Sequence, residues 1–287
     1  MLISQNGHSF PIGYTAIAEE DGKHRDMLMD FGILKLQASQ VFQSTDGKER
    51  AFLLMRGAVT FQWSVGGHSE SHPVARRSLL DEEPTVLHVP AGVAVSITAD
   101  GEEAELAVQA RRNEKVFQSR LWKPGDYRSD RFGEGTLQDT STRTVRTVFD
   151  AATAPDSVMV LGEVIDHPGK WSSYPPHDHA QPEIYHFRHF PRQGFGLSIQ
   201  GEEVFIVRNG DTVTIPPSVV HPQCAAPGYA MYYIWMIPHL EGDRFGPDSR
   251  VFRPEHEWVM DPKAPIWPDA GLAEVEGYQQ RTRGQKE

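Results

Sequence analysis

Residues 177–183 read His177-Asp178-His179-Ala180-Gln181-Pro182-Glu183, and about forty residues later the segment 216–221 ends in His221. In an extended segment, residues two apart face the same side, so His177 and His179 are expected to point together. Glu183 follows a turn that contains proline, and His221 comes shortly after an expected strand. The pattern predicts that three imidazoles and one carboxylate close on a divalent metal ion, with the ligands His177, His179, Glu183 and His221.

The chemistry of this ligand set narrows the choice of metal. Imidazole and carboxylate together suit first-row transition metals, and we predict one divalent ion of zinc, manganese, nickel or iron. A His-x-His pair alone can arise by chance in a chain with 13 histidines, but the offsets of Glu183 and His221 favour a metal site. Three nearby residues are expected to be wall, surface or core residues rather than ligands, namely His186, His189 and Cys224.

The segments around this motif alternate apolar and polar residues in the manner of β-strands. Short alternating runs broken by glycine and proline are typical of antiparallel sandwiches and barrels, and no long amphipathic helix competes with them. We therefore predict an all-β fold. The expected strands are 34–38, 51–55, 59–65, 85–89, 95–99 and 104–108 in the first half, and 157–164, 183–187, 203–207, 212–215 and 230–236 in the second.

A polar, turn-rich stretch at residues 113–153 separates the two sets of strands and marks a domain boundary. We predict an N-terminal domain at 1–125 and a C-terminal, metal-binding domain at 126–260. The remaining residues, 261–287, form a polar extension whose end is expected to be mobile.

The two halves share a strand that is followed by proline. Aligning Pro90 with Pro216 puts Val95 at the position of His221. This indicates a duplicated fold in which only the second copy keeps metal ligands.

Composition argues against several classes of partner. The chain has 287 residues, with 28 basic and 39 acidic side chains and a formal charge of −11, which disfavours nucleic acid and anionic membranes. Neither a signal sequence nor a run of 18 apolar residues is visible. Cys224 is the single cysteine, which excludes an internal disulfide and fits a reducing compartment. We expect a soluble, cytoplasmic protein that binds neither nucleic acid nor membrane.

The motif spacing resembles a known family. Gly169 with His177-x-His179-x3-Glu183, and Gly210-x5-Pro216-x-Ser218-x2-His221, resemble the two cupin motifs, with serine where glycine is usual in the second. The amino-acid sequences of segments 169–179, 193–196 and 221–233 resemble those of 5-deoxy-glucuronate isomerases of myo-inositol catabolism, which are related to 4-deoxy-5-ketouronate isomerases. The resemblance covers most of residues 30–260.

This resemblance implies a bicupin, that is, two tandem antiparallel jelly-roll barrels with the metal in the C-terminal one. It assigns the same four ligands and implies an aldose–ketose isomerase that converts 5-deoxy-D-glucuronate to 2-deoxy-5-keto-D-gluconate. The expected partner is a small sugar acid. Because exposed cupin sheets often pair, a homodimer is also expected.

Isomerisation of this kind moves a proton between neighbouring carbons through a cis-enediolate, which a Lewis-acid metal stabilises. The sequence does not identify the base. Glu183 is a candidate for shuttling the proton, and Tyr174 and Tyr185 are candidates for hydrogen bonding near the metal. Arg188 or Arg208 is a candidate for holding the substrate carboxylate through a bidentate contact.

Two departures from the family leave the substrate open. The hairpin after Gly196 is shorter than is usual, and Trp235 stands where asparagine is typical. Two other functions also remain open. The same three-histidine, one-glutamate ligand set with Fe(II) would suit a cupin dioxygenase, and a non-catalytic sugar-binding cupin is the third interpretation.

Overall fold

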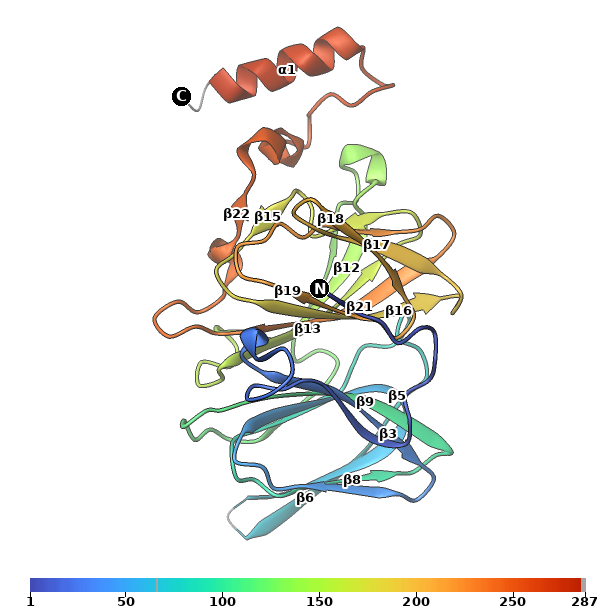
Figure 1. Cartoon of the computed structure of the whole chain (residues 1–287), viewed down its shortest axis with the longest axis vertical. Helices are drawn as coiled ribbons and strands as arrows, with labels where there is room; N and C mark the ends of the chain where they lie inside the picture. The colour runs from blue at the N-terminus through green and yellow to red at the C-terminus, as the bar shows by residue number, and fades with distance from the viewer. Residues whose placement is uncertain (66, 285–287) are drawn as a thin grey trace.

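The computed structural model describes residues 1–65 and 67–284, and it shows two β-sandwiches stacked along the long axis of the molecule (Figure 1). This agrees with the expected all-β fold. The N-terminal sandwich is one nine-stranded sheet that folds over itself. Its strands are β2 (Gly13–Ala18), β3 (Asp30–Gln37), β4 (Val41–Ser44), β5 (Glu49–Val65), β6 (His68–Arg76), β7 (Val86–Val89), β8 (Val95–Ala99), β9 (Glu103–Arg111) and β10 (Arg120–Trp122), with the 3-10 helix η1 (Arg25–Met27).

Strand β5 joins the two layers of this sandwich. Its first half pairs with β7 and β9, and its second half pairs with β6 and β8. The sequence predicted two strands divided at Arg56 and Gly57, whereas the structure has one bent strand. The register with β9 shifts between Leu54 and Arg56, and Gly57 has a φ of +101°. A Cβ at Gly57 would lie 2.3 Å from the carbonyl oxygen of Glu103, so the bend requires glycine.

The C-terminal sandwich consists of a seven-stranded and a four-stranded sheet, with the order β1-β19-β16-β21-β13-β12-β11 in the first and β14-β20-β17-β18 in the second. Its elements are β11 (Arg128–Phe132), β12 (Arg143–Phe149), β13 (Met159–Asp166), β14 (Trp171–Ser172), β15 (His177–Asp178), β16 (Glu183–Phe190), β17 (Phe195–Gln200), β18 (Glu203–Arg208), β19 (Thr212–Ile215), β20 (Gln223–Ala225), β21 (Ala230–Pro238) and the 3-10 helix η2 (Leu137–Asp139).

The predicted boundary at residue 125 lies between β10, which belongs to the first sandwich, and β11, which belongs to the second. The start of the chain departs from this division. Strand β1 (Leu2–Ile3) pairs with β19 of the C-terminal sandwich, so residues 2–3 do not belong with the rest of 1–125. Figure 1 shows the N-terminus lying beside β19.

Three apolar clusters stabilise this arrangement. One contains residues of both large sheets, such as Phe31 and Leu53 on one side and Ile184 and Met236 on the other, so the two sandwiches share a core. The second cluster fills the N-terminal sandwich. The third fills the C-terminal sandwich and includes Tyr185, one of the predicted site residues.

The C-terminal extension differs from the expected polar tail, because it contains regular structure. It follows η3 (Pro247–Ser249), β22 (Val251–Phe252) and η4 (Pro254–Met260), and it forms helix α1 (Leu272–Gly284), which projects from the sandwich (Figure 1). The expected mobility of the tail's end concerns residues 285–287, which lie outside the described residues. Within the described ranges, no helix is both long and apolar enough to cross a membrane.

Candidate metal centre

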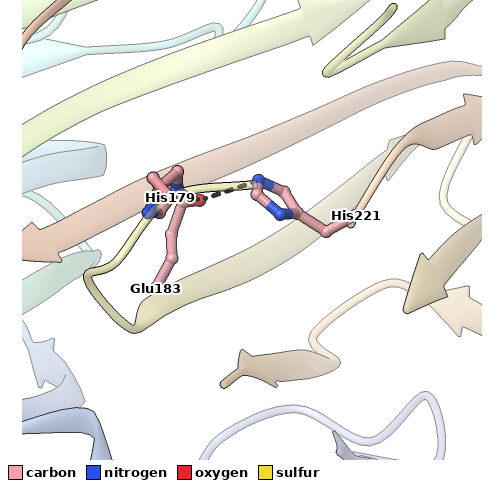
Figure 2. Close-up of side chains that lie close together, drawn as sticks. All are labelled: His179, Glu183 and His221. Carbon is pink, nitrogen blue, oxygen red and sulfur yellow. Dashed lines mark hydrogen bonds and ion pairs between the residues drawn. The ribbon is translucent and has the colours of Figure 1, made fainter. Parts of the chain in front are cut away.

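Three of the four predicted ligands converge in the C-terminal sandwich. Glu183 is the first residue of β16, His179 precedes it in the short loop after β15, and His221 follows β19. The Nε2 atoms of His179 and His221 each lie 3.2 Å from the same Glu183 oxygen, Oε2. Figure 2 shows the carboxylate of Glu183 between the two imidazole rings. All three side chains are buried, and their ligand atoms lie within 4.8 Å of one another.

His177 lies beside this cluster. Its ring contacts that of His221 edge-on, with 5.3 Å between ring centroids, and it lines the same cavity. The intervening Asp178 accepts a hydrogen bond from Arg253 at 2.5 Å. The geometric cluster itself contains three residues, so the fourth ligand remains a prediction.

Backbone carbonyls fix the tautomers of two imidazoles. His221 donates from Nδ1 to the carbonyl of Val219, and His177 donates from Nδ1 to the carbonyl of Pro175, each at 2.8 Å. A carbonyl oxygen only accepts, so in the neutral rings the lone pair belongs to Nε2. The Nε2 lone pair of His221 then faces a carboxylate oxygen that also only accepts. A cation between them, either a proton or a metal ion, satisfies both.

The pKa shifts of these side chains also favour a bound cation. Burial alone would raise the pKa of Glu183, but the hydrogen bonds from His179 and His221 lower that pKa to about 2. Burial would lower the pKa of His221, but Glu183 raises it. Burial, with His221 next, lowers the pKa of His177 to about 3, so this ring is neutral at pH 7. An anionic carboxylate beside imidazoles is the donor set that a divalent transition metal takes, the metal ion replacing the proton between them.

The cluster opens into a cavity of about 510 Å³. Tyr174 and Tyr185, both predicted at the sequence level, line it. The hydroxyl of Tyr185 lies 3.1 Å from Ser173 Oγ, and burial raises the pKa of Tyr185 well above its ordinary value. Burial also raises the pKa of Tyr174. Both phenols are therefore protonated hydrogen-bond donors at neutral pH.

The two predicted substrate-binding arginines are not in this cavity. Arg188 points from β16 toward the N-terminal sandwich, where it forms an ion pair with Glu105 at 2.8 Å and contacts His186. Arg208 is exposed at the end of β18. The alternation of side chains along β16 explains why Arg188 lies outside the cavity. Glu183 and Tyr185 face the cavity, so the even-numbered residues of the strand face away from it.

The short hairpin also lies apart from the cavity. It is formed by the antiparallel strands β17 and β18. Phe195 pairs with Arg208 at one end of the hairpin, and Gln200 pairs with Glu203 next to the turn. Within the described chain, no residue of 195–208 is among those lining the cavity, so the expected effect of this hairpin on substrate contacts is not supported.

Sequence patterns missed the cavity residues that come from other strands and from the C-terminal segment. Arg143 lies on β12, Tyr233 on β21, and Arg250 between η3 and β22. No short motif links these positions to the histidines, so a single sequence carried no signal for them. Apolar walls come from Trp235, Ile237, Phe245 and Phe252.

Comparison with known proteins settles the family. A model of the KduI/IolB family matches residues 6–259. The chain belongs to the KduI/IolB family. A relative from Geobacillus kaustophilus named 5-deoxy-glucuronate isomerase is 30% identical over 63% of this chain and 67% of its own length. Relatives with the same name from Shouchella clausii and Bacillus subtilis are 27% and 26% identical and align over 88% and 98% of their lengths.

Solved structures agree with the fold. An IolB-like protein from Salmonella typhimurium has a TM-score of 0.74 at 21% identity, over 88% of this chain and 97% of its own. An oxalate decarboxylase has a TM-score of 0.64 at 11% identity, over 96% of this chain and 85% of its own. The expected bicupin fold is confirmed, as is the expected enzyme class, an isomerase.

Within this family member, the pairing registers locate the counterpart of the metal cluster in the N-terminal cupin. Arg50 of β5 pairs with Val89 of β7, just as Glu183 pairs with Ile215. Arg50 therefore takes the position of Glu183. Its buried guanidinium donates to Ser44 Oγ at 2.6 Å and to the carbonyl of Val93 at 2.5 Å.

Residues six and four positions before Arg50 also correspond to ligand positions of the C-terminal cupin. Ser44 and Asp46 stand where His177 and His179 stand relative to Glu183, and Ser44 pairs with Val95, the counterpart of His221. In the N-terminal cupin, the guanidinium of Arg50 with its hydroxyl and carbonyl partners therefore stands at the position that His179, Glu183 and His221 occupy in the C-terminal cupin.

Proposed function

We propose that this protein is a metal-dependent aldose–ketose isomerase acting on a deoxy-uronate, namely conversion of 5-deoxy-D-glucuronate to 2-deoxy-5-keto-D-gluconate in myo-inositol catabolism. The convergence of His179, Glu183 and His221 in a cavity carries the proposal, since this donor set suits a Lewis acid. The names of the relatives support the choice of substrate. A cytoplasmic location is part of the proposal.

We assign His177, His179, Glu183 and His221 as the residues that hold the metal, which is zinc, manganese, nickel or iron. When bound, a divalent ion would supply Lewis-acid stabilisation of negative charge on the oxygens of the two substrate carbons that exchange oxidation state. Glu183 supplies the carboxylate of this cluster, so we assign it the shuttling of the proton between the two substrate carbons.

The phenols position the substrate. Tyr185 and Tyr174 remain protonated because burial raises their pKa values, so each donates a hydrogen bond rather than acting as a base. Trp235 and Phe245 provide apolar walls that exclude water from the substrate.

The substrate carboxylate needs a cation, and two arginines line the cavity. Arg143 donates to the carbonyls of Ser141 at 2.7 Å and Tyr174 at 3.2 Å, and Arg250 lies at the exposed side. The other described hydrogen bonds of these guanidiniums also go to neutral oxygens, from Arg143 to Ser141 Oγ and from Arg250 to the carbonyl of Pro247. The positive charge of either arginine can therefore pair with an anionic ligand. Replacing Arg250 with glutamine should raise KM for the uronate and leave bound metal unchanged.

The test is NMR of the metal-replete protein in D2O with 5-deoxy-glucuronate and, separately, 4-deoxy-5-ketouronate. The expected result is isomerisation of the first substrate, with deuterium appearing at the former aldehyde carbon if the proton exchanges with solvent. Turnover of neither compound would overturn the proposal. Oxygen consumption by the iron-loaded protein would instead favour a dioxygenase, because an isomerase consumes none.

A further inference from the structure

A buried carboxyl group lies behind the wall of the cavity. Asp166, the last residue of β13, is fully buried, and its Oδ2 lies 2.7 Å from Ser172 Oγ. Its other oxygen, Oδ1, has no hydrogen-bond partner among the residues that the structure describes. Arg143 is its cross-strand neighbour, but the guanidinium donates to carbonyls instead. An ionised carboxylate in this setting is poorly compensated.

Ser172 links this carboxyl to the cavity. The same Oγ lies 2.8 Å from the hydroxyl of Tyr233, which lines the cavity. The ring of Tyr233 packs against that of Tyr185, with 4.5 Å between centroids. Asp166, Ser172 and Tyr233 therefore form one buried hydrogen-bonded chain that ends at the cavity wall.

The chain can run in two directions, because each hydroxyl has a single hydrogen. If Asp166 is protonated, it donates to Ser172 and Ser172 donates to Tyr233, so Ser172 does not use the phenolic hydrogen, which can be offered to the cavity. If Asp166 is ionised, Ser172 donates to it and Tyr233 donates to Ser172. The phenol then offers only a lone pair to the cavity.

We propose that Asp166 is a positioning residue that, as a neutral carboxylic acid, makes Tyr233 a hydrogen-bond donor to an oxygen of the sugar-acid substrate. The inference rests on the proposed function, since it concerns the same cavity. The donor is expected to stabilise negative charge that develops on that oxygen, which a lone pair would oppose.

The surroundings of Asp166 agree with a neutral acid. Burial raises the pKa of Asp166 to about 8, although Ser172 and then Arg143 lower it. The titratable groups around it are Arg143 on β12, Cys224 on β20 and Tyr233 on β21. Burial raises the pKa of Cys224 to about 11 and that of Tyr233 well above 10, so neither is ionised near neutrality. The donor state should therefore be lost as pH rises through about 8.

The first measurement does not depend on turnover. Infrared difference spectra between pH 7 and pH 9 should show the carbonyl stretch of a buried carboxylic acid, and Asp166→Asn should lack this signal. Asp211→Asn is the matched control, because Asp211 is equally buried but accepts hydrogen bonds through both oxygens. Absence of an Asp166-dependent signal would overturn the inference, whatever the substrate.

The second measurement is the pH profile of kcat/KM. In Asp166→Asn the amide is a permanent donor to Ser172, so activity near pH 7 should persist and the fall above pH 8 should disappear. Asp166→Ala and Tyr233→Phe should each lower kcat/KM about tenfold, the loss of one hydrogen bond, and the double variant no further. A profile of Asp166→Asn identical to that of the unmodified protein, or additive losses, would contradict the chain.

Ser172→Ala provides a second route if a variant at Asp166 does not fold. It interrupts the chain and should flatten the same limb of the profile. Affinity for D-glucuronate, measured by calorimetry across pH 6–9, tests the donor without catalysis. If the isomerase proposal fails but this affinity still falls through pH 8 in an Asp166-dependent way, the positioning role stands independently.

Discussion

At the scale of single residues, backbone carbonyls fix the tautomers of two imidazoles at the candidate metal site. The carbonyls of Val219 and Pro175 hold the Nδ1 protons of His221 and His177, and each ring is left with a lone pair on Nε2. Both carbonyls lie two residues before their histidine, so local chain geometry sets the tautomers. Two different loops therefore fix the tautomer of a histidine through the same local hydrogen bond.

His179 tests the ligand assignment. Replacing it with alanine removes one of the two imidazoles in contact with Glu183, and we expect bound metal and activity to fall together, activity by more than about 100-fold. Metal content by mass spectrometry and turnover by NMR measure the two effects. His72→Ala, at a half-exposed ring in the N-terminal cupin, should change neither. Full metal content with an unchanged rate would refute the ligand role of His179.

Trp235 tests the choice of substrate. It lies over Gly162, where a Cβ would meet its ring at 2.3 Å, and it lines the cavity. Trp235→Asn restores the residue that is typical of the family and opens space beside Gly162. The ratio of kcat/KM for the two uronates should change by about tenfold, in line with the value of a hydrophobic contact, without loss of metal. An unchanged ratio would show that this wall does not select the substrate.

At the scale of elements, Asp211 connects the start of the chain to the sheet that carries the candidate metal site. Its side chain is fully buried in the turn between β18 and β19. Oδ1 accepts from Ser4 Oγ at 2.9 Å and from the Gln5 amide at 2.8 Å, and Oδ2 accepts from the Arg208 amide at 2.8 Å. These bonds hold β1 against β19, the strand that leads to His221.

Asp211→Ala should therefore lower the free energy of unfolding by about 1–3 kcal/mol, because buried donors lose their acceptor. Urea unfolding followed by fluorescence measures this change. Asp100→Ala provides the control, since Asp100 is exposed and accepts a hydrogen bond from the Thr60 hydroxyl, so its loss should cost less than about 1 kcal/mol. Equal effects of the two substitutions would argue against a role for the arm formed by the first residues.

At the scale of the whole molecule, a buried charge cluster joins the two cupins. Glu163 on β13 accepts from Arg76 of the N-terminal cupin at 2.6 Å and from Arg146 at 3.2 Å, and the hydroxyl of Tyr232 contacts it. All four side chains are buried. The cluster lies beside the apolar core that the two large sheets share.

Glu163→Gln should destabilise the protein by about 3–5 kcal/mol, because two buried guanidiniums lose their carboxylate partner. Thermal unfolding in low salt, followed by tryptophan fluorescence and circular dichroism, measures the loss. Glu103→Gln is a matched control in the half-exposed pair with Lys35, where the change should stay below about 1 kcal/mol. A small effect at Glu163 would mean that the shared apolar core alone joins the domains.

Local sequence was sufficient for some features and not for others. The strands at 183–187 and 212–215 were predicted because their alternation is strong, and the structure extends the first to β16 and matches the second as β19. The division of β5 was wrong because Gly57 permits a bend within a strand, which resembles a turn in the sequence. Helix α1 was missed because its polar sequence has no apolar stripe.

The sequence by itself determined the all-β class, the family resemblance and the grouping of His179, Glu183 and His221, because these depend on spacing along a strand or on motifs of adjacent residues. Tertiary structure decided which arginines face the cavity. Arg188 is three residues after the cavity-facing Tyr185 on the same strand yet faces the other cupin, while Arg143 and Arg250 reach the cavity from distant segments. The link from Asp166 through Ser172 to Tyr233 also exists only in the folded chain, because three separate strands bring its hydroxyls within hydrogen-bonding distance.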